Sequence, residues 1–126
     1  VDVNGVVKTD IIVANSGSNN VCVLLTTGNG TFAAQTTYST GTGPYKAAAA
    51  DVNGDNKTDI IVVNLRSNNA GVLLNVGNGT FSPQTTYSTG NWPNSVVAAD
   101  VNGDGKPDII VSNYVSNNVG VLFKYC

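Results

Sequence analysis

The sequence predicts an all-β fold, and three features of its 126 residues support that prediction. Short runs rich in Val, Ile and Thr alternate with Asn- and Gly-rich segments typical of turns. No segment places apolar residues at helical spacing between helix caps. No stretch of about 18 apolar residues is present either, so no membrane-spanning helix is expected. We therefore expect short strands joined by tight turns.

A repeat of 49 residues organises the chain. Asp2, Asp51 and Asp100 each open one copy of a nine-residue segment, which reads DVNGVVKTD, DVNGDNKTD and DVNGDGKPD in turn. Residues 2–50 and 51–99 are identical at 32 of 49 aligned positions. Repeats of about 40–50 residues are typical of propeller blades, each a four-stranded antiparallel sheet. The predicted fold is therefore an array of propeller-type blades.

Each repeat is expected to supply four strands in a fixed order. An apolar run before the nine-residue segment forms the first strand, at 46–50 and 95–99. The second begins Asp-Ile-Ile-Val, and its continuous β-branched run suits a strand buried on both faces. A Ser-Asn-Asn turn precedes the third strand, and an Asn-Gly turn precedes the fourth. The expected ranges are 10–13, 59–62 and 108–111 for the second strand, 21–25, 71–74 and 119–123 for the third, and 35–40 and 84–89 for the fourth.

These strands divide the chain into about two and a half repeats. Residues 1–50 lack the inner strand, residues 51–99 form a complete blade, and residues 100–126 lack the outer part. Propellers typically need four to eight blades, so this chain is not expected to close a ring alone. Its ends are expected to meet copies of itself, in a ring or a fibre, or further repeats of a longer chain. Four evenly spaced aromatic residues are expected to pack between blades: Phe32, Phe81, Tyr38 and Tyr87.

All eight carboxylates of the chain fall in the three nine-residue segments. Carboxylates crowded on one loop repel each other unless a cation lies between them. Hard oxygen ligands at alternating positions suit Ca²⁺ better than a transition metal. In the second and third segments, positions 1, 3, 5 and 9 offer side-chain oxygens, and the lysine at position 7 offers its backbone carbonyl. The expected ligands are Asp51, Asn53, Asp55, Lys57 and Asp59, and Asp100, Asn102, Asp104, Lys106 and Asp108.

The first segment departs from this pattern. Val6 stands at position 5 and has no oxygen to give. The remaining candidate ligands are Asp2, Asn4, the Lys8 carbonyl and Asp10. We therefore expect a weak or empty site in this segment.

Other interpretations of the segments are less consistent with the sequence. An EF-hand needs Gly at position 6 and Glu at position 12, whereas Asn56 is at position 6 of the second segment and Val62 and Val111 are at position 12. A dockerin motif also needs a ligand at position 12 and leads into a helix, which Ile-Ile-Val starts poorly. Plain Asp- and Gly-rich turns remain an alternative, but two intact copies at a fixed period argue against it.

The pattern D-x-N-G-D-x-K-x-D-I-I-V, followed by S-N-N-x-x-V-L-L and G-N-G-T-F, resembles the FG-GAP and VCBS repeat families. The resemblance covers nearly the whole chain, and the second and third segments match the ligand positions of these families. It implies a propeller blade, bound Ca²⁺ and an extracellular setting, secreted or on the cell surface. It implies no single activity. The literal Phe-Gly and Gly-Ala-Pro signatures are absent, which leaves the subfamily open.

A catalytic role is not expected. The chain has no His and no Glu, and neither Cys22 nor Cys126 has a His partner. The net charge of −2 excludes a basic nucleic-acid footprint. We expect a structural or adhesive extracellular module that calcium stiffens. The alternative is glycan recognition, as a lectin-like module or an accessory domain of a larger secreted enzyme, through Trp92 and Tyr45 in the connections between blades. Both aromatic residues would equally serve to cover blade edges.

Two further features leave alternatives open. Asn29, Asn56 and Asn78 open N-x-T sequons and are candidate N-glycosylation sites, although Asn29 and Asn78 also fit as turn residues. Cys22 and Cys126 occupy non-equivalent positions of the repeat. Two separate thiols, a bond to a partner and an internal disulfide all remain open for them.

Overall fold

The structure is a computed structural model that describes residues 2–5 and 9–123, and this part of the chain contains strands and no helix. The strands form three main antiparallel sheets and two small hairpins. The first blade is β1 (Ile11–Asn15), β2 (Asn20–Leu24) and β5 (Thr36–Ser39), in the order β1-β2-β5. The second blade is β6 (Pro44–Ala50), β7 (Asp59–Asn64), β8 (Asn69–Leu73) and β11 (Thr85–Ser88), in the order β11-β8-β7-β6. The third blade is β12 (Pro93–Ala99), β13 (Asp108–Asn113) and β14 (Asn118–Leu122), in that order.

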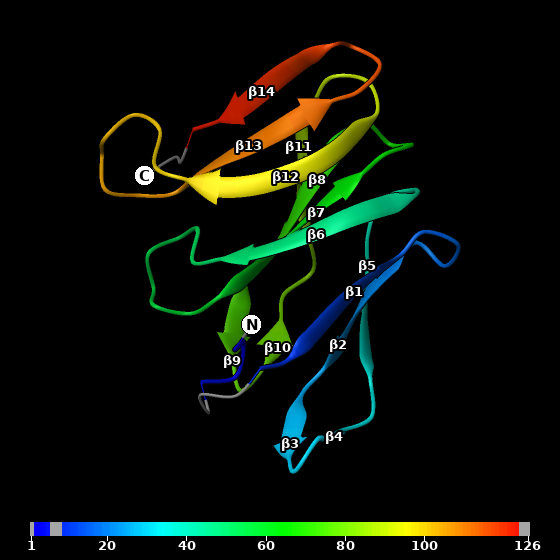
Figure 1. Ribbon diagram of the computed structural model, residues 1–126, viewed down its shortest axis with the longest axis vertical. Coiled ribbons are helices and arrows are strands. Elements are labelled where there is room, and N and C mark those ends of the chain that lie inside the picture. Colours follow the sequence, from blue (N-terminus) through cyan, green and yellow to red (C-terminus); the bar gives the residue numbers. More distant parts are fainter. Residues whose placement is uncertain (1, 6–8, 124–126) are drawn as a thin grey trace.

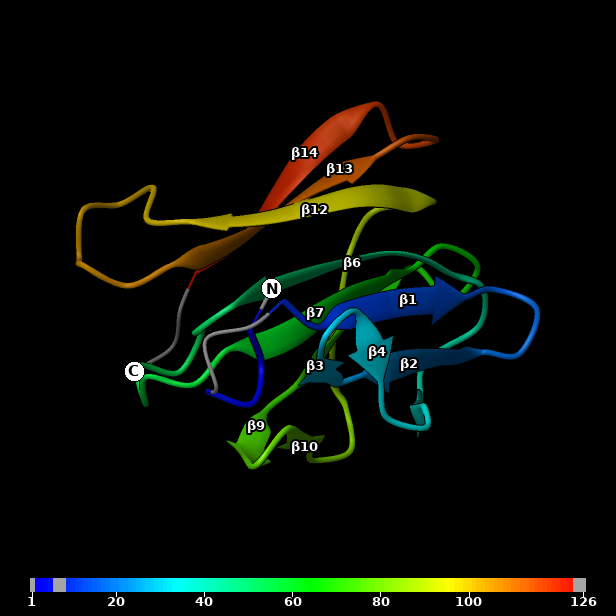
Figure 2. The ribbon, with the colours of Figure 1, turned by 60° about the horizontal axis from the view of Figure 1, so that its bottom comes forward.

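The three blades follow one another along the long axis of the molecule, with the second blade between the other two (Figures 1 and 2). The sheets stay open and do not close into a ring. The predicted all-β fold of antiparallel propeller-type blades is therefore confirmed. No helix in the described residues is long and apolar enough to cross a bilayer.

Two short hairpins were not expected as strands. They are β3 (Thr26–Gly28) with β4 (Thr31–Phe32), and β9 (Asn75–Gly77) with β10 (Thr80–Phe81). Each folds back at an Asn-Gly pair, and all four turn residues have φ between 54° and 75°. Positive φ at both central residues is the geometry of a type I′ hairpin turn. The predicted turns are therefore present, and each closes a small hairpin of its own.

The Ser-Asn-Asn turns join the second strand of a blade to the third, and their side chains contact the segment that leads into the next blade. Asn19 and Asn68 adopt a left-handed conformation, with φ of 54°, which Asn tolerates better than most residues. The side-chain oxygen of Asn19 accepts a hydrogen bond from the N–H of Gly43 at 2.9 Å, and that of Asn68 accepts one from the N–H of Trp92 at 2.8 Å. These bonds fix the chain as it enters the next blade.

The core lies between the blades. Strand β7 is buried along its whole length, and its side chains alternate between two faces. Ile60 and Val62 belong to the cluster shared with the first blade, and Ile61 and Val63 to the cluster shared with the third. Burying one such side chain stabilises the fold by roughly 1.5–3 kcal/mol. The prediction that the second strand of a repeat is buried on both faces is correct for β7 and wrong for β1, where Ile11 is 39% exposed and Val13 40% exposed.

Aromatic residues contribute to both cores. In the cluster shared with the first blade, the rings of Tyr38 and Phe81 meet edge to face with centroids 5.5 Å apart. Tyr87 packs against the cluster shared with the third blade. The exposed fraction of Phe81 is 6%, but that of Phe32 is 41%. The interblade packing predicted for Phe32 is therefore wrong in this structure, because no blade covers that side of the first blade. Cys22 is buried as a free thiol, and Cys126 lies outside the described residues.

Candidate metal centre

The aspartate segments lie where the first strand of a blade turns into the second. Residues 51–58 join β6 to β7, and residues 100–107 join β12 to β13. Both loops project on the same side of the molecule, at the left of Figure 1. The described part of the first segment, residues 2–5 and 9–10, leads into β1. The repeat therefore aligns its loops along one edge of the array.

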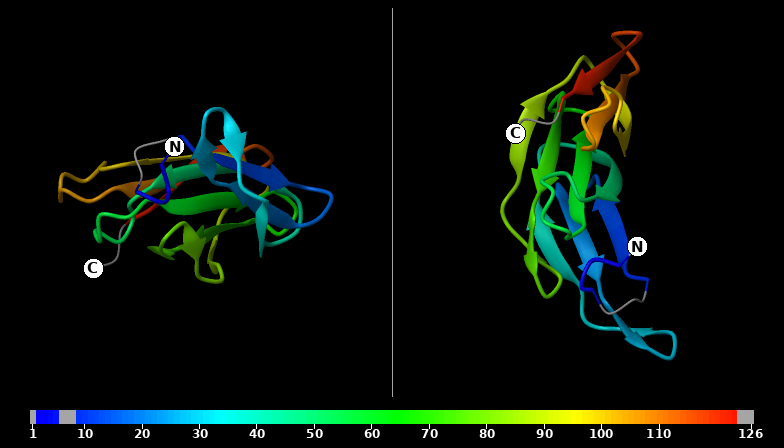
Figure 3. Two further views of the ribbon diagram at one scale, coloured as in Figure 1. Left: turned by 90° about the horizontal axis from the view of Figure 1, so that it is seen from below. Right: turned by 90° about the vertical axis from the view of Figure 1, so that its left-hand side faces the viewer.

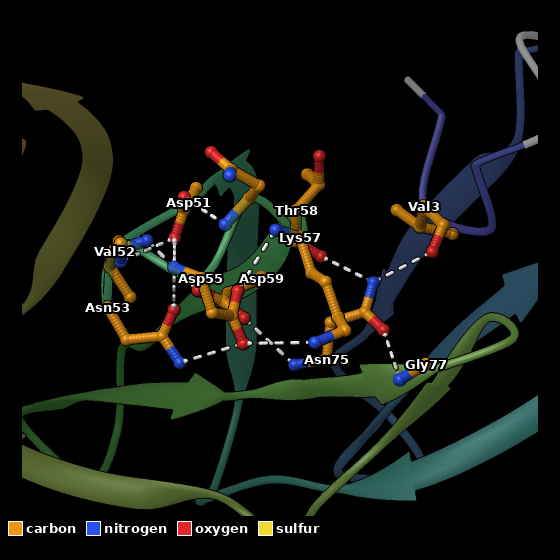
Figure 4. A network of polar contacts seen from close by, with 12 residues as sticks. Val3, Asp51, Val52, Asn53, Asp55, Lys57, Thr58, Asp59, Asn75 and Gly77 are labelled. Carbon is orange, nitrogen blue, oxygen red and sulfur yellow. Dashed lines mark hydrogen bonds and ion pairs between the residues drawn. The ribbon is translucent and has the colours of Figure 1, made fainter.

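The aspartate at position 9 of the second loop is fully buried. Its two oxygens accept hydrogen bonds from two backbone N–H groups: Oδ2 of Asp59 from Val52 at 2.9 Å, and Oδ1 from Asn75 at 2.8 Å (Figure 4). Burial raises the pKa of Asp59, the two N–H groups oppose that rise, and the nearby carboxylates of Asp55 and Asp51 add to it. This carboxylate closes the loop and ties it to the residue that follows the third strand.

The other two segments use position 9 in the same way. Asp10 accepts hydrogen bonds from the N–H groups of Val3 and Thr26, both at 2.9 Å. Asp108 is fully buried and accepts one from the N–H of Val101 at 3.0 Å. Three buried aspartates at a 49-residue spacing thus share one structural role.

The aspartate at position 1 holds the turn of the loop. Oδ1 of Asp51 accepts hydrogen bonds from the N–H groups of Gly54 at 2.7 Å and Asp55 at 3.2 Å, and Oδ2 accepts one from Asn56 at 2.8 Å. Gly54 has φ of 81°, a conformation that glycine adopts without strain. The carboxylate therefore already has three backbone donors around it.

The third loop repeats this geometry. Asp100 accepts hydrogen bonds from the N–H groups of Gly103 at 2.7 Å, Asp104 at 3.2 Å and Gly105 at 2.8 Å. The Gly105 N–H is the main cause of a lowered pKa at Asp100; desolvation opposes it, and the other N–H groups reinforce the lowering. The second and third loops therefore have the same hydrogen-bonded geometry although their sequences differ.

Positions 3 and 5 contact each other at the exposed side of the loop. Oδ1 of Asn53 accepts a hydrogen bond from the Asp55 N–H at 3.2 Å, and its Nδ2 donates to Oδ2 of Asp55 at 3.3 Å. Asp55 also accepts from the Lys57 N–H at 2.9 Å and pairs with the Lys57 ammonium at 3.5 Å. Desolvation works to raise the pKa of Asp55, but these contacts outweigh it and the pKa is lowered. Asn102, Asp104 and Lys106 make the corresponding backbone and amide contacts in the third loop.

The donor chemistry of these loops fits Ca²⁺. The side-chain oxygens of Asp51 and Asn53 converge on one N–H group, that of Asp55, so positions 1 and 3 face the same space. Carboxylate, amide and carbonyl oxygens are the ligands that Ca²⁺ prefers. Over the described part of the chain, however, no three His, Cys, Asp or Glu side chains gather closely enough to hold a metal. Backbone N–H groups are the partners of the carboxylates in this structure, and a carboxylate oxygen retains further acceptor capacity beside them.

The first loop is described only in part. Oδ1 of Asp2 accepts hydrogen bonds from the N–H groups of Asn4 at 3.2 Å and Gly5 at 2.7 Å, as in the other loops. Val6 and Lys8, on which the expected weakness of this site and one of its ligands depend, lie outside the described residues.

Sequence reasoning did not identify Asn75 as a functional residue. This residue is buried, and its Nδ2 donates to the Thr58 carbonyl at 2.9 Å and to the Val3 carbonyl at 2.7 Å (Figure 4). Its Oδ1 accepts from the Gly77 N–H at 2.8 Å. The corresponding residue of the first repeat is Thr26, so periodicity carried no signal for this position. Asn75 links the second loop to the first.

An exposed aromatic pair lies at the start of the third blade. Trp92 has an exposed fraction of 48% and φ of 56°, where the preceding repeat has Gly43 with φ of 64°. Its carbonyl accepts a hydrogen bond from the N–H of Tyr114, which is 66% exposed. Tyr45, the other predicted aromatic candidate, is exposed as well, but it lies within β6 and not in the connection between blades. The three sequon residues are exposed too: Asn29, Asn56 and Asn78.

The fold and its loops define an open array of propeller-type blades, each with an aspartate loop that leads into its central strand. The model of the FG-GAP-like repeat family matches residues 2–62 and 51–111, and each match begins at the first aspartate of a loop. The chain belongs to the FG-GAP-like repeat family. The resemblance seen in the sequence is thereby confirmed. No curated protein matches the chain.

Proposed function

We propose that this chain is a non-catalytic, extracellular, calcium-binding repeat module with a structural or adhesive role. It associates with copies of itself or with further repeats of a longer chain. The observation that carries the proposal is the pair of loops at 51–59 and 100–108, which hold the same oxygen ligands in the same hydrogen-bonded geometry. A turn that serves only to reverse the chain does not need so many carboxylates.

Calcium would bind through the acceptor capacity that these carboxylate oxygens keep beside their backbone N–H partners. Asp51, Asn53 and Asp55 supply side-chain oxygens, and the Lys57 carbonyl and Asp59 complete the set. The third loop supplies the matching ligands. The ion would neutralise the repulsion that the Asp51 and Asp55 carboxylates exert on Asp59. It would also join the two strands that the loop connects. The affinity expected for an extracellular module with a neutral Asn ligand is roughly 10⁻⁴ to 10⁻³ M.

The absence of a catalytic role is supported by the residues available. The chain has no His and no Glu, and general acid–base or nucleophilic chemistry needs a tuned proton acceptor near the reacting atom. The aspartates are engaged in holding the loops. Calcium stiffening of a repeat array is a role that needs no further chemistry.

Titration calorimetry of metal-free protein with Ca²⁺ tests the proposal, with Mg²⁺ as the control ion. We expect heat from two equivalent sites with Ca²⁺ and a rise in melting temperature. Mg²⁺ should give much weaker binding, because it demands a near-ideal octahedron and sheds its water reluctantly. An absence of both heat and thermal stabilisation with Ca²⁺ would refute calcium binding.

Glycan recognition is a second candidate, and the conformation of Trp92 favours it. A bulky residue in the left-handed region costs roughly 1–3 kcal/mol, and such strain concentrates at functional sites. Trp92 and Tyr114 together present two exposed aromatic side chains at one end of the third blade. A glycan array probed with wild-type protein and with Trp92→Gly decides this candidate: binding by the wild type alone supports it, and no binding by either eliminates it.

A further inference from the structure

The aspartates that close the first and second loops are connected by a chain of three hydrogen bonds. Oδ1 of Asp59 accepts from the N–H of Asn75 at 2.8 Å, and Nδ2 of Asn75 donates to the carbonyl of Val3 at 2.7 Å. The N–H of Val3 in turn donates to Oδ2 of Asp10 at 2.9 Å. Asp10 and Asp59 stand at position 9 of successive segments. Two candidate calcium ligands in different blades are therefore joined through one side chain, that of Asn75.

The orientation of the Asn75 amide is fixed by its partners (Figure 4). Its Nδ2 faces two carbonyl oxygens, those of Thr58 and Val3, and its Oδ1 faces the N–H of Gly77. Exchanging the amide nitrogen and oxygen would set oxygen against oxygen at both carbonyls. The residue is only 4% exposed, so water competes little for these groups. Asn75 therefore keeps its contacts to both loops in one arrangement only.

On the second loop, the contacts of Asn75 fall within the expected ligand set. Thr58, whose carbonyl it binds, is at position 8, between the Lys57 carbonyl at position 7 and the Asp59 carboxylate at position 9. Its own N–H binds that carboxylate. An ion that fixes positions 7 and 9 would therefore also fix Thr58 and, through it, the Asn75 side chain.

On the first loop, the same side chain contacts the residue between two candidate ligands. Val3 lies between Asp2 and Asn4, and its carbonyl is held by Asn75. This loop offers fewer ligands than the second, because Val6 has no oxygen to give. Ordering a loop costs conformational entropy, which few ligands offset poorly. Order supplied from the second loop would therefore matter most here.

We propose that Asn75 is a positioning residue that couples the two loops, so that Ca²⁺ bound at 51–59 orders residues 2–5 and raises the Ca²⁺ affinity of the first loop. This inference rests on the calcium binding of the proposed function. Hydrogen-bond networks carry such coupling, and the coupling is reciprocal. Within the described residues, the hydrogen bonds of Asn75 reach the first and second loops and not the third. The side of the molecule that carries the loops faces the viewer in Figure 3, right.

Amide hydrogen exchange of the full chain, followed residue by residue by NMR, tests the coupling. The readout is the Val3 N–H, whose bond to Asp10 reports order in the first loop. With Ca²⁺ roughly tenfold above the dissociation constant of the two intact sites, its exchange in the wild type should slow about fivefold or more. Asp55→Ala removes a ligand of the second loop and should abolish most of this slowing. Asp104→Ala is the matched change in the third loop and should leave the slowing in place.

Asn75→Thr isolates the side chain. It keeps the N–H that Asp59 accepts and removes the Nδ2 donor, and Thr is the residue that the first repeat has at this position. This variant should still bind Ca²⁺ in calorimetry but lose the slowing at Val3. If the wild type binds Ca²⁺ and the slowing is absent, persists in Asn75→Thr, or is equal in Asp55→Ala and Asp104→Ala, the coupling is wrong while calcium binding stands. If calorimetry of the wild type shows no calcium binding, both are wrong.

Discussion

Asn75 donates a hydrogen bond to the carbonyl oxygen of Val3, 72 residues earlier in the chain, at 2.7 Å. The same amide nitrogen also bonds the Thr58 carbonyl. One buried side chain therefore holds the aspartate loops of two successive blades at a fixed separation. The relative placement of the first and second blades depends on this polar contact as well as on their shared apolar core.

Asn75→Ala should destabilise the protein by about 2–3 kcal/mol. The substitution removes two donated hydrogen bonds and leaves two carbonyl oxygens short of a partner, at about 1 kcal/mol or more each. Urea unfolding followed by circular dichroism measures the loss. Thr26→Ala, at the corresponding position of the exposed first hairpin, is the control and should cost less than about 0.5 kcal/mol. Equal losses for both variants would show that the link between loops carries no stability.

Asp55→Ala and Asp104→Ala should each remove one calcium site. In Ca²⁺ at 10 to 100 times the dissociation constant, each should lower stability by about 1.4–2.7 kcal/mol, because a ligand that binds only the folded state stabilises it by mass action. In chelator the losses should be small, since the contacts of Asp55 are exposed. Thermal melts with and without Ca²⁺ measure both. A loss that is the same in Ca²⁺ and in chelator would mean that the loop is only a turn.

Asp59→Ala should behave differently from Asp55→Ala. The Asp59 carboxylate is fully buried and accepts hydrogen bonds from two backbone N–H groups. Its removal leaves both donors unsatisfied and should cost about 3 kcal/mol or more, with or without Ca²⁺. Chemical unfolding in chelator isolates this structural part. A stable Asp59→Ala protein in chelator would contradict the role of this residue as the closure of the loop.

Phe81→Ala and Phe32→Ala form a matched pair in repeated elements. Phe81 fills the interface between the first and second blades, so its truncation should cost about 3–5 kcal/mol. Phe32 is partly exposed in the single chain, so its truncation should cost less than about 1 kcal/mol when measured at low protein concentration. Thermal or urea unfolding of dilute protein distinguishes them. A large loss for Phe32→Ala in dilute protein would place this ring in a core within the chain.

Trp92→Gly should stabilise the protein by about 1 kcal/mol, because glycine adopts the left-handed conformation at no steric cost. The opposite effect is expected for Gly43→Ala at the corresponding position, where φ is 64° and an added Cβ would lie 3.0 Å from Cγ of Arg66. Melting temperatures of the two variants test the pair. If Trp92→Gly lowers stability, the packing of the indole outweighs the backbone strain.

The repeat explains why so much of the fold could be predicted from sequence. The period, the β-branched runs and the Asn turns each specify local structure, and each appears more than once. Asn75, Trp92 and Tyr114 differ from their counterparts in other repeats, so the contacts of Asn75 and the strain at Trp92 could be seen only in three dimensions. Phe32 was misjudged because its burial depends on a neighbouring blade and not on its own sequence. The backbone partners of the candidate ligands were also beyond prediction, since they follow from the path of the folded loop.

The difference in burial between β7 and its counterpart β1 has a further consequence. Ile11 and Ile60 occupy the same repeat position, yet the first is 39% exposed and the second is fully buried. Tolerance to substitution at one repeat position is therefore set by the cover that neighbouring blades provide. The same change is mild where one face of a blade is uncovered and severe where both faces are covered, so selection acts unequally on identical segments. A copy covered on both faces is held to its sequence by its neighbours, while a copy with an uncovered face tolerates more change.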